Sequence, residues 1–187
     1  MRHAVARQLG HFFSPSLSNS QSTLKRRIPM RSHIAAILLA SAPLAMAATQ
    51  PYDESADARA GIRAAQAEAQ RAKVLVLVVF GANWCGDCKF LDIAFRDGPS
   101  APLIARNFKV VKVNVGRFDQ NVEIAESFGV PLKTGIPAAA VLSEQGKVLY
   151  ATRPGELSAA RSMGEKGIYN FVTRVAAQGK GLRPTPP

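Results

Sequence analysis

The sequence has few residues of several chemically useful types, and their scarcity limits what the protein can do. All three histidines, His3, His11 and His33, lie close to the N-terminus, and the chain has only two cysteines. A domain that begins after this region has no histidine, which excludes Cys–His nucleophilic catalysis and the usual mixed Cys/His zinc sites. Two cysteines cannot complete a closed structural zinc site either, so among metal sites only a two-coordinate site for a soft ion stays open.

Acidic residues are absent from residues 1–47, which carry six of the 24 basic residues. The rest of the chain has 18 basic and 13 acidic residues, so most of the formal charge of +11 belongs to the N-terminal region. That remainder has no basic run and no alternation of basic and aromatic residues, and we therefore expect no nucleic-acid binding. The length of 187 residues suits a leader followed by one ordinary domain, and the chain has no internal repeat.

Residues 30–47 have the layout of a secretory signal peptide. A basic start is followed by an apolar run over residues 34–44 and by Ala45-Met46-Ala47, an A-x-A cleavage site. Cleavage after Ala47 would deliver the protein to the periplasm or the exterior. Because the apolar run is shorter than a typical membrane span, an uncleaved inner-membrane anchor is the minor alternative.

The remaining boundaries follow from composition. Residues 1–29 are rich in Arg and Ser, which is typical of an organelle import signal, but a mis-called start before Met30 explains them more simply. We expect a linker over residues 48–55, a folded domain over residues 56–178 and a loose tail over residues 179–187.

The centre of the domain is the motif Trp84-Cys85-Gly86-Asp87-Cys88-Lys89. It follows a continuous, β-branched apolar run over residues 74–80, which predicts a strand buried on both faces. Residues 88–95 have helical spacing. The cysteines therefore lie where a central strand leads into the N-terminus of a helix.

This position predicts a redox role for both cysteines. Free N–H groups and the helix dipole stabilise an anion in the first turn, so we expect Cys85 to be the reactive thiolate. Cys88, one turn further on, would resolve the mixed disulfide. The alternative is an inert structural disulfide, but so short a loop would constrain the unfolded chain little. Trp84, next to the nucleophile, favours an exposed platform for a partner.

The other elements follow from hydrophobic periodicity and turn residues. We expect helices over residues 56–73, 88–95, 101–107, 119–128 and 167–177, and strands over residues 74–80, 108–115, 138–142 and 147–152. Asp119 is the expected N-cap of the fourth helix. This order predicts an α/β domain with a mixed sheet of about four strands flanked by helices.

At this point the motifs resemble the thioredoxin family. Phe80-x-x-x-Trp84-Cys85-Gly86-x-Cys88-Lys89 stands about fifty residues before Ile136-Pro137, which opens a strand, and the resemblance covers residues 56–177. The added N-terminal helix and Asp87 are similar to exported bacterial members, such as the C-terminal domain of the transmembrane disulfide reductase. The resemblance implies a thioredoxin-like fold, a cis peptide before Pro137, and substrate contacts from Ile136 and Pro137.

Two departures from the family pattern concern redox tuning. Between the cysteines stand Gly86 and Asp87, and a carboxylate in place of the family's proline would disfavour a thiolate. Val79 occupies the place of a buried aspartate that assists proton removal from the second cysteine. Lys112 matches the lysine that accompanies this aspartate in the family. Because the aspartate itself is absent, we expect the Lys112 side chain to be solvated, and we expect Cys88 to lose its proton to water or to Asp87.

The sequence therefore predicts an exported thiol–disulfide oxidoreductase that reduces protein disulfides through Cys85 and Cys88. We expect no bound cofactor and no metal, a monomer, disulfide-containing protein substrates, and a dithiol electron donor held in the membrane. Two alternatives stay open: a disulfide-donating oxidase of the same fold, and a non-catalytic module that binds a soft metal or a substrate.

Overall fold

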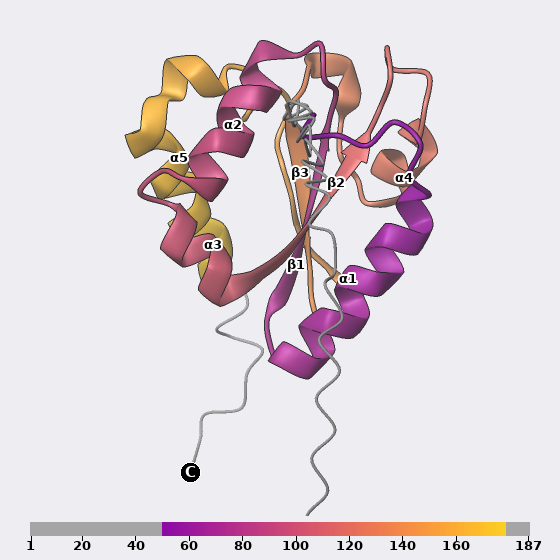
Figure 1. The fold of residues 1–187 in the computed structure, drawn as a ribbon, viewed down its shortest axis with the longest axis vertical. Coiled ribbons are helices and arrows are strands. Elements are labelled where there is room, and N and C mark those ends of the chain that lie inside the picture. The colour runs from indigo at the N-terminus through magenta and orange to yellow at the C-terminus, as the bar shows by residue number, and fades with distance from the viewer. Residues whose placement is uncertain (1–49, 179–187) are drawn as a thin grey trace, which may run out of the picture. The chain divides into compact units, whose positions relative to one another are not determined.

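The computed structural model describes residues 50–178, which form a four-stranded sheet between two layers of helices (Figure 1). The expected leader, the first two residues of the expected linker and the expected tail lie outside the described residues.

The strands are β1 (Leu75–Gly81), β2 (Phe108–Asn114), β3 (Ala138–Leu142) and β4 (Val148–Ala151). The helices are α1 (Ala58–Ala72), α2 (Gly86–Arg96), α3 (Ala101–Asn107), α4 (Val122–Ser127) and α5 (Ala160–Ala177), with a 3-10 turn η1 (Leu132–Thr134).

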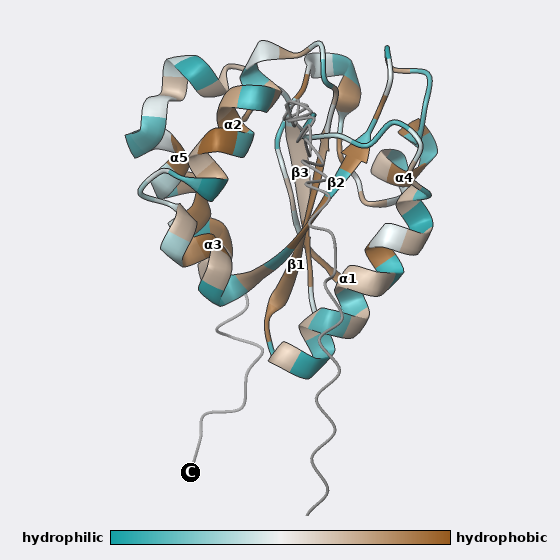
Figure 2. Cartoon of the chain, in the orientation of Figure 1, coloured by the Kyte–Doolittle hydropathy of each residue, from teal (hydrophilic) through white to brown (hydrophobic). Residues whose placement is uncertain are grey.

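β1 lies in the middle of the sheet, whose strand order is β2-β1-β3-β4. It pairs parallel with β2 and antiparallel with β3, and every one of its residues is buried. Val76, Val78 and Phe80 pack against α1 and α4, whereas Leu75, Leu77 and Val79 pack against α2, α3 and α5. In Figure 2 hydrophobic residues (brown) run along β1, and hydrophilic residues (teal) lie on outer turns of helices such as α1. The mixed sheet, the buried central strand and the additional N-terminal helix confirm the predicted fold class.

The helices α4 and α5 differ most from their predicted ranges. α4 begins at Val122 because Asp119 does not cap it; the Asp119 carboxylate accepts a hydrogen bond from the Arg117 N–H instead, at 2.9 Å. α5 begins at Ala160, ahead of the predicted start, and bends at Gly164, whose φ of 62° interrupts the helical backbone. Helical periodicity does not continue across this bend, which is why the sequence revealed only the second part.

Part of the segment over residues 50–55, assigned to a linker on composition, packs onto the domain through Tyr52, whereas Asp53, Glu54 and Ser55 are exposed. The Tyr52 side chain is 2% exposed and belongs to the core beside β1. Its backbone N–H donates to Oδ1 of Asn83 at 3.0 Å, and Nδ2 of Asn83 donates back to the Tyr52 carbonyl at 2.7 Å. This segment is therefore part of the fold and braces the loop that precedes the cysteines.

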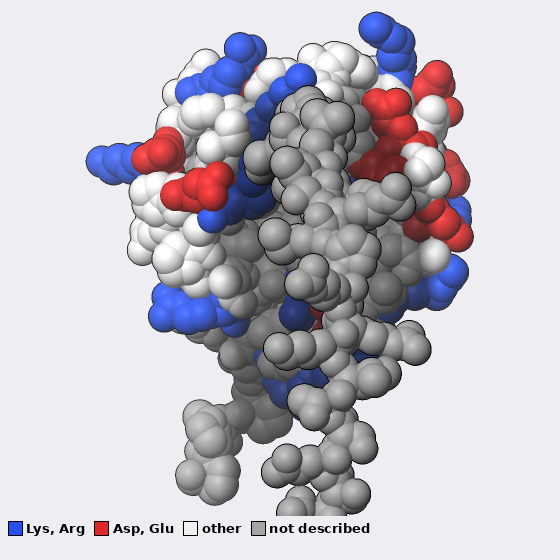
Figure 3. Space-filling model, in the orientation of Figure 1, with Lys and Arg blue, Asp and Glu red and all other residues white. Residues whose placement is uncertain are grey.

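None of the helices among residues 50–178 combines the length and the apolar character that crossing a membrane requires. On the face drawn in Figure 3, basic and acidic side chains are interspersed with uncharged ones. Residues 50–178 contain 16 basic and 13 acidic residues, which agrees with a mixed surface rather than a basic one.

Candidate active site

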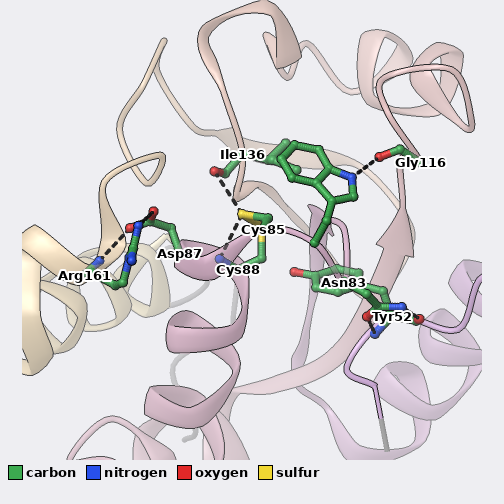
Figure 4. The surroundings of a disulfide bond; sticks show 9 residues. Tyr52, Asn83, Cys85, Asp87, Cys88, Gly116, Ile136 and Arg161 are labelled. Carbon is green, nitrogen blue, oxygen red and sulfur yellow. Dashed lines mark hydrogen bonds and ion pairs between the residues drawn. A yellow bond between two sulfur atoms is a disulfide. The ribbon is translucent and has the colours of Figure 1, made fainter.

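The cysteine motif lies where the buried strand β1 leads into α2. Cys85 has extended backbone angles and is the N-cap residue of α2. Its Sγ accepts a hydrogen bond from the Cys88 N–H at 3.1 Å (Figure 4). The sulfur of Cys85 thus receives a backbone N–H group that has no partner within the helix, and it lies at the positive end of the helix dipole. Both stabilise a thiolate once the bond to Cys88 is reduced.

Cys85 and Cys88 form a disulfide, with their Cα atoms 5.2 Å apart. Cys88 is completely buried, whereas Cys85 retains 6% exposure and lines a groove at the surface. A partner sulfur has access to the pair only from the Cys85 side.

The segment from Ile136 to Pro137 faces Cys85 across the groove. The Ile136–Pro137 peptide bond is cis, and both side chains are buried. The carbonyl oxygen of Ile136 lies 3.5 Å from the Sγ of Cys85, although 51 residues separate the two in the chain. The fold therefore brings together the two motifs that the sequence analysis linked.

Trp84 is half exposed beside the disulfide, at 50% of its surface. Its indole N–H donates to the Gly116 carbonyl at 2.8 Å, and its ring meets Phe118 edge-on with centroids 6.0 Å apart. The Arg117 guanidinium lies 5.9 Å from the centre of the indole. Trp84 is thus a fixed aromatic surface. Phe118, 43% exposed, extends it, and no periodic signal in the sequence pointed to that residue.

These groups border one groove of about 460 Å³. It is lined by Trp84, Cys85, Gly86, Asp87, Phe118, Thr134, Gly135, Ile136, Ser158 and Arg161. Five of the seven predicted site residues line the groove: Trp84, Cys85, Gly86, Asp87 and Ile136. Of the other two, Cys88 lies beneath Cys85, and Pro137 follows Ile136 into the start of β3, so only the sulfur of Cys85 is presented to the groove.

Asp87 forms an ion pair that the sequence did not reveal. Its Oδ1 accepts from the backbone N–H of Arg161 at 2.9 Å, and its Oδ2 accepts from the guanidinium at 3.0 Å. The hydrogen bond to the Arg161 side chain, reinforced by the one to its backbone, lowers the pKa of Asp87. In Figure 4 the carboxylate points toward Arg161 and away from the two sulfurs. The isolated negative charge assumed from the sequence is therefore already paired.

Lys112 also has a partner, contrary to the expectation of a solvated side chain. Lys112 lies next to Val79 in the parallel register of β1 and β2, and both side chains face α2. There the ammonium group pairs with the carboxylate of Asp92, which is only 7% exposed. Lys112 thus has a carboxylate partner on the helix, where Val79 on the strand provides none. Asp92 stands four residues after Cys88, a spacing that places both on one face of α2.

Within residues 50–178, no group of three or more His, Cys, Asp or Glu side chains is placed to hold a metal ion. The two cysteines are the only thiol ligands that the chain has.

Comparison with known proteins agrees with this geometry. A family model described as thioredoxin-like matches residues 57–143. A disulphide isomerase from Xylella fastidiosa Temecula1 is 46% identical, with 69% of this chain and 98% of that chain aligned and a TM-score of 0.66. A thioredoxin from Thermus thermophilus is 20% identical over 64% of this chain and 87% of its own, with a TM-score of 0.45. A putative disulphide-isomerase from Bacteroides thetaiotaomicron is 25% identical, with 56% of this chain and 87% of that chain aligned and a TM-score of 0.40. No curated protein sequence matches the chain.

Three observations agree on the family and on the chemistry. The cysteines lie at a strand-to-helix junction, they form the Cys85–Cys88 disulfide, and the Xylella relative is 46% identical in sequence. This chain belongs to the thioredoxin family and is a thiol–disulfide oxidoreductase.

Proposed function

We propose that this oxidoreductase reduces disulfides of exported proteins, with Cys85 as the nucleophile and Cys88 as the resolving thiol. The observation that carries the proposal is the difference between the two sulfurs. Cys85 lines the groove and caps α2, whereas Cys88 is fully buried behind it. An intermolecular attack needs an accessible thiolate, and an intramolecular release needs only a thiol within reach of the first sulfur.

The proposed cycle balances within the two proteins. The thiolate of Cys85 attacks one sulfur of the substrate disulfide, which breaks as a mixed disulfide forms, and the departing substrate thiolate takes up a proton. Cys88 then loses its proton and attacks the Sγ of Cys85, which releases the second substrate thiolate. Two electrons and two protons pass to the substrate, and the Cys85–Cys88 disulfide remains. A dithiol donor, proposed to reside in the membrane, would reduce it again.

The surroundings of Cys85 favour a reductant over an oxidant. Strong disulfide donors are oxidants because their reduced form is stabilised. Among residues 50–178, the Cys88 N–H is the only N–H group that donates to the Sγ of Cys85, and the nearby guanidinium of Arg161 is engaged by Asp87. Few groups therefore stabilise the Cys85 thiolate of the reduced protein, which favours the disulfide form and makes the dithiol a better reductant.

A redox titration against glutathione, combined with reduction of insulin, tests this direction. We expect the wild type to reduce insulin and Cys85→Ser to be inactive. Cys88→Ser should accumulate mixed disulfides with its natural targets, which identifies them. A reduction potential near the value of about −120 mV typical of a strong disulfide donor would overturn the proposal in favour of the oxidase. Metal analysis of the reduced protein tests the soft-metal alternative.

The proposed compartment depends on residues 30–47, whose basic start, apolar run and A-x-A site are typical of export. The N-terminal sequence of protein recovered from the periplasm should begin at Ala48. Recovery of the intact chain from the membrane would favour the anchored alternative.

Disulfide isomerisation is a second candidate, because the Xylella relative of 46% identity is described as a disulphide isomerase. Isomerisation uses the same attack by Cys85, but a thiol of the substrate itself releases the enzyme. Cys88→Ser separates the two activities: a reductase loses turnover, whereas an isomerase still reactivates a substrate with scrambled disulfides.

A further inference from the structure

Arg161, in the first turn of α5, reaches across to the first turn of α2. Its backbone N–H and its guanidinium hold the two carboxylate oxygens of Asp87, at 2.9 Å and 3.0 Å. The two residues are 74 positions apart in the chain, so only the folded protein brings them together (Figure 4). α5 has no side-chain cap of its own, and Asp87 therefore serves as one from a neighbouring helix.

The guanidinium of Arg161 also lies against Gly86, the residue directly after Cys85. A Cβ atom at Gly86 would be 3.3 Å from the Cζ of Arg161, closer than side chains ordinarily approach. Glycine thus leaves room for the cation at the start of α2. A positive charge therefore lies against Gly86 and a negative charge is carried by Asp87, the two residues that follow the nucleophilic cysteine, and each charge limits the effect of the other.

We propose that Arg161 is a positioning residue that, through Asp87, sets how strongly the reduced protein holds Cys85 as a thiolate. The relevant equilibrium converts the protein disulfide and two molecules of glutathione into the protein dithiol and glutathione disulfide. One S–S bond breaks and another forms, and two electrons and two protons pass to the protein. Whatever stabilises the Cys85 thiolate moves this equilibrium toward the dithiol.

The two charges therefore act in opposite directions. Without the guanidinium, the Asp87 carboxylate repels a thiolate at Cys85, and the disulfide is favoured. Without the carboxylate, the guanidinium attracts the thiolate, and the dithiol is favoured. The Arg161 side chain is 65% exposed, so water and salt weaken both effects without removing them. The effect of the two charges concerns only thiol–disulfide exchange at Cys85, so it does not depend on whether the protein reduces or oxidises its substrates.

The test is the equilibrium with glutathione for Arg161→Gln, Asp87→Asn and the double variant. We expect Arg161→Gln to lower the equilibrium constant for reduction by about threefold and Asp87→Asn to raise it by about threefold. The double variant should return close to the wild-type value. Both single shifts should shrink in high salt, because exposed charges are screened. Ultraviolet absorbance of the reduced variants should show thiolate formation at higher pH for Arg161→Gln and at lower pH for Asp87→Asn.

Arg174→Gln is the matched control. It removes an arginine of the same helix that pairs with Glu156, away from the groove, and should leave the equilibrium unchanged. Arg161→Lys, which keeps the charge, should stay closer to the wild type than Arg161→Gln. If both single variants move the equilibrium in the same direction, or if neither moves it, the pair is only a clamp between two helices and the proposal is wrong.

Discussion

Lys112 on β2 and Asp92 on α2 form an ion pair between the sheet and the helix that carries the cysteines. The carboxylate is 7% exposed and the lysine side chain 27%, so the pair is largely shielded from water. Arg96 meets the same carboxylate from the surface, at 3.1 Å. Through Lys112, this buried carboxylate ties the middle of α2 to β2, the strand next to β1.

We expect Asp92→Ala to destabilise the fold by about 2 kcal/mol, because it leaves the Lys112 ammonium without its partner in a shielded place. Chemical denaturation measures the change in the free energy of unfolding. Arg96→Ala removes the outer partner of the same carboxylate, is 59% exposed, and should cost less than about 1 kcal/mol. Equal losses for the two variants would show that the Lys112 contact adds nothing.

The pairing of Asp87 with Arg161 should make stability depend on pH. The hydrogen bond to the Arg161 side chain holds the pKa of Asp87 below its ordinary value of 3.8 in the folded protein. The stabilisation is therefore fully present above that ordinary value and is lost as the pH falls through the lower, folded pKa. Thermal unfolding of wild type and Asp87→Asn should differ at neutral pH and converge in strong acid. A difference that persists unchanged in strong acid would contradict this account.

Trp84 should affect partner binding more than redox chemistry. Its ring is half exposed, is held by the Gly116 carbonyl and packs against Phe118, so it offers a rigid apolar surface beside Cys85. We expect Trp84→Ala to raise the KM for a protein disulfide by about tenfold, as loss of a central interface aromatic does, while the glutathione equilibrium stays unchanged. Tyr169→Ala removes another exposed aromatic residue outside the groove and should change neither value.

The sequence predicted what is encoded locally. The uninterrupted apolar run predicted the buried strand β1, and the helical spacing of residues 88–95 after it predicted that the cysteines lie at the start of α2. The pairs Lys112–Asp92 and Arg161–Asp87 were missed because their members lie 20 and 74 residues apart and have no periodic signature. Lys112 was expected to be solvated because its partner was sought on the strand, at Val79. Only the packing of α2 on the sheet shows that the partner of Lys112 is Asp92, four residues after Cys88.

The most informative stability test concerns Gly81, the last residue of β1. A Cβ atom there would collide with the hydroxyl and ring of Tyr52, which comes from the segment that composition assigned to a linker. We expect Gly81→Ala to cost about 1–3 kcal/mol, because overfilling a packed core forces its neighbours to move.

In a Tyr52→Ala background the same substitution should cost much less, since the colliding ring is gone, and the double-mutant cycle gives the coupling directly. Gly61→Ala in α1 is the matched control. Its new methyl group would make only an ordinary contact, 3.4 Å from Val111, and should stabilise the helix by about 0.5–1 kcal/mol. If Gly81→Ala costs the same with and without the Tyr52 ring, the N-terminal segment does not pack beneath the cysteine loop, and its assignment to the domain fails.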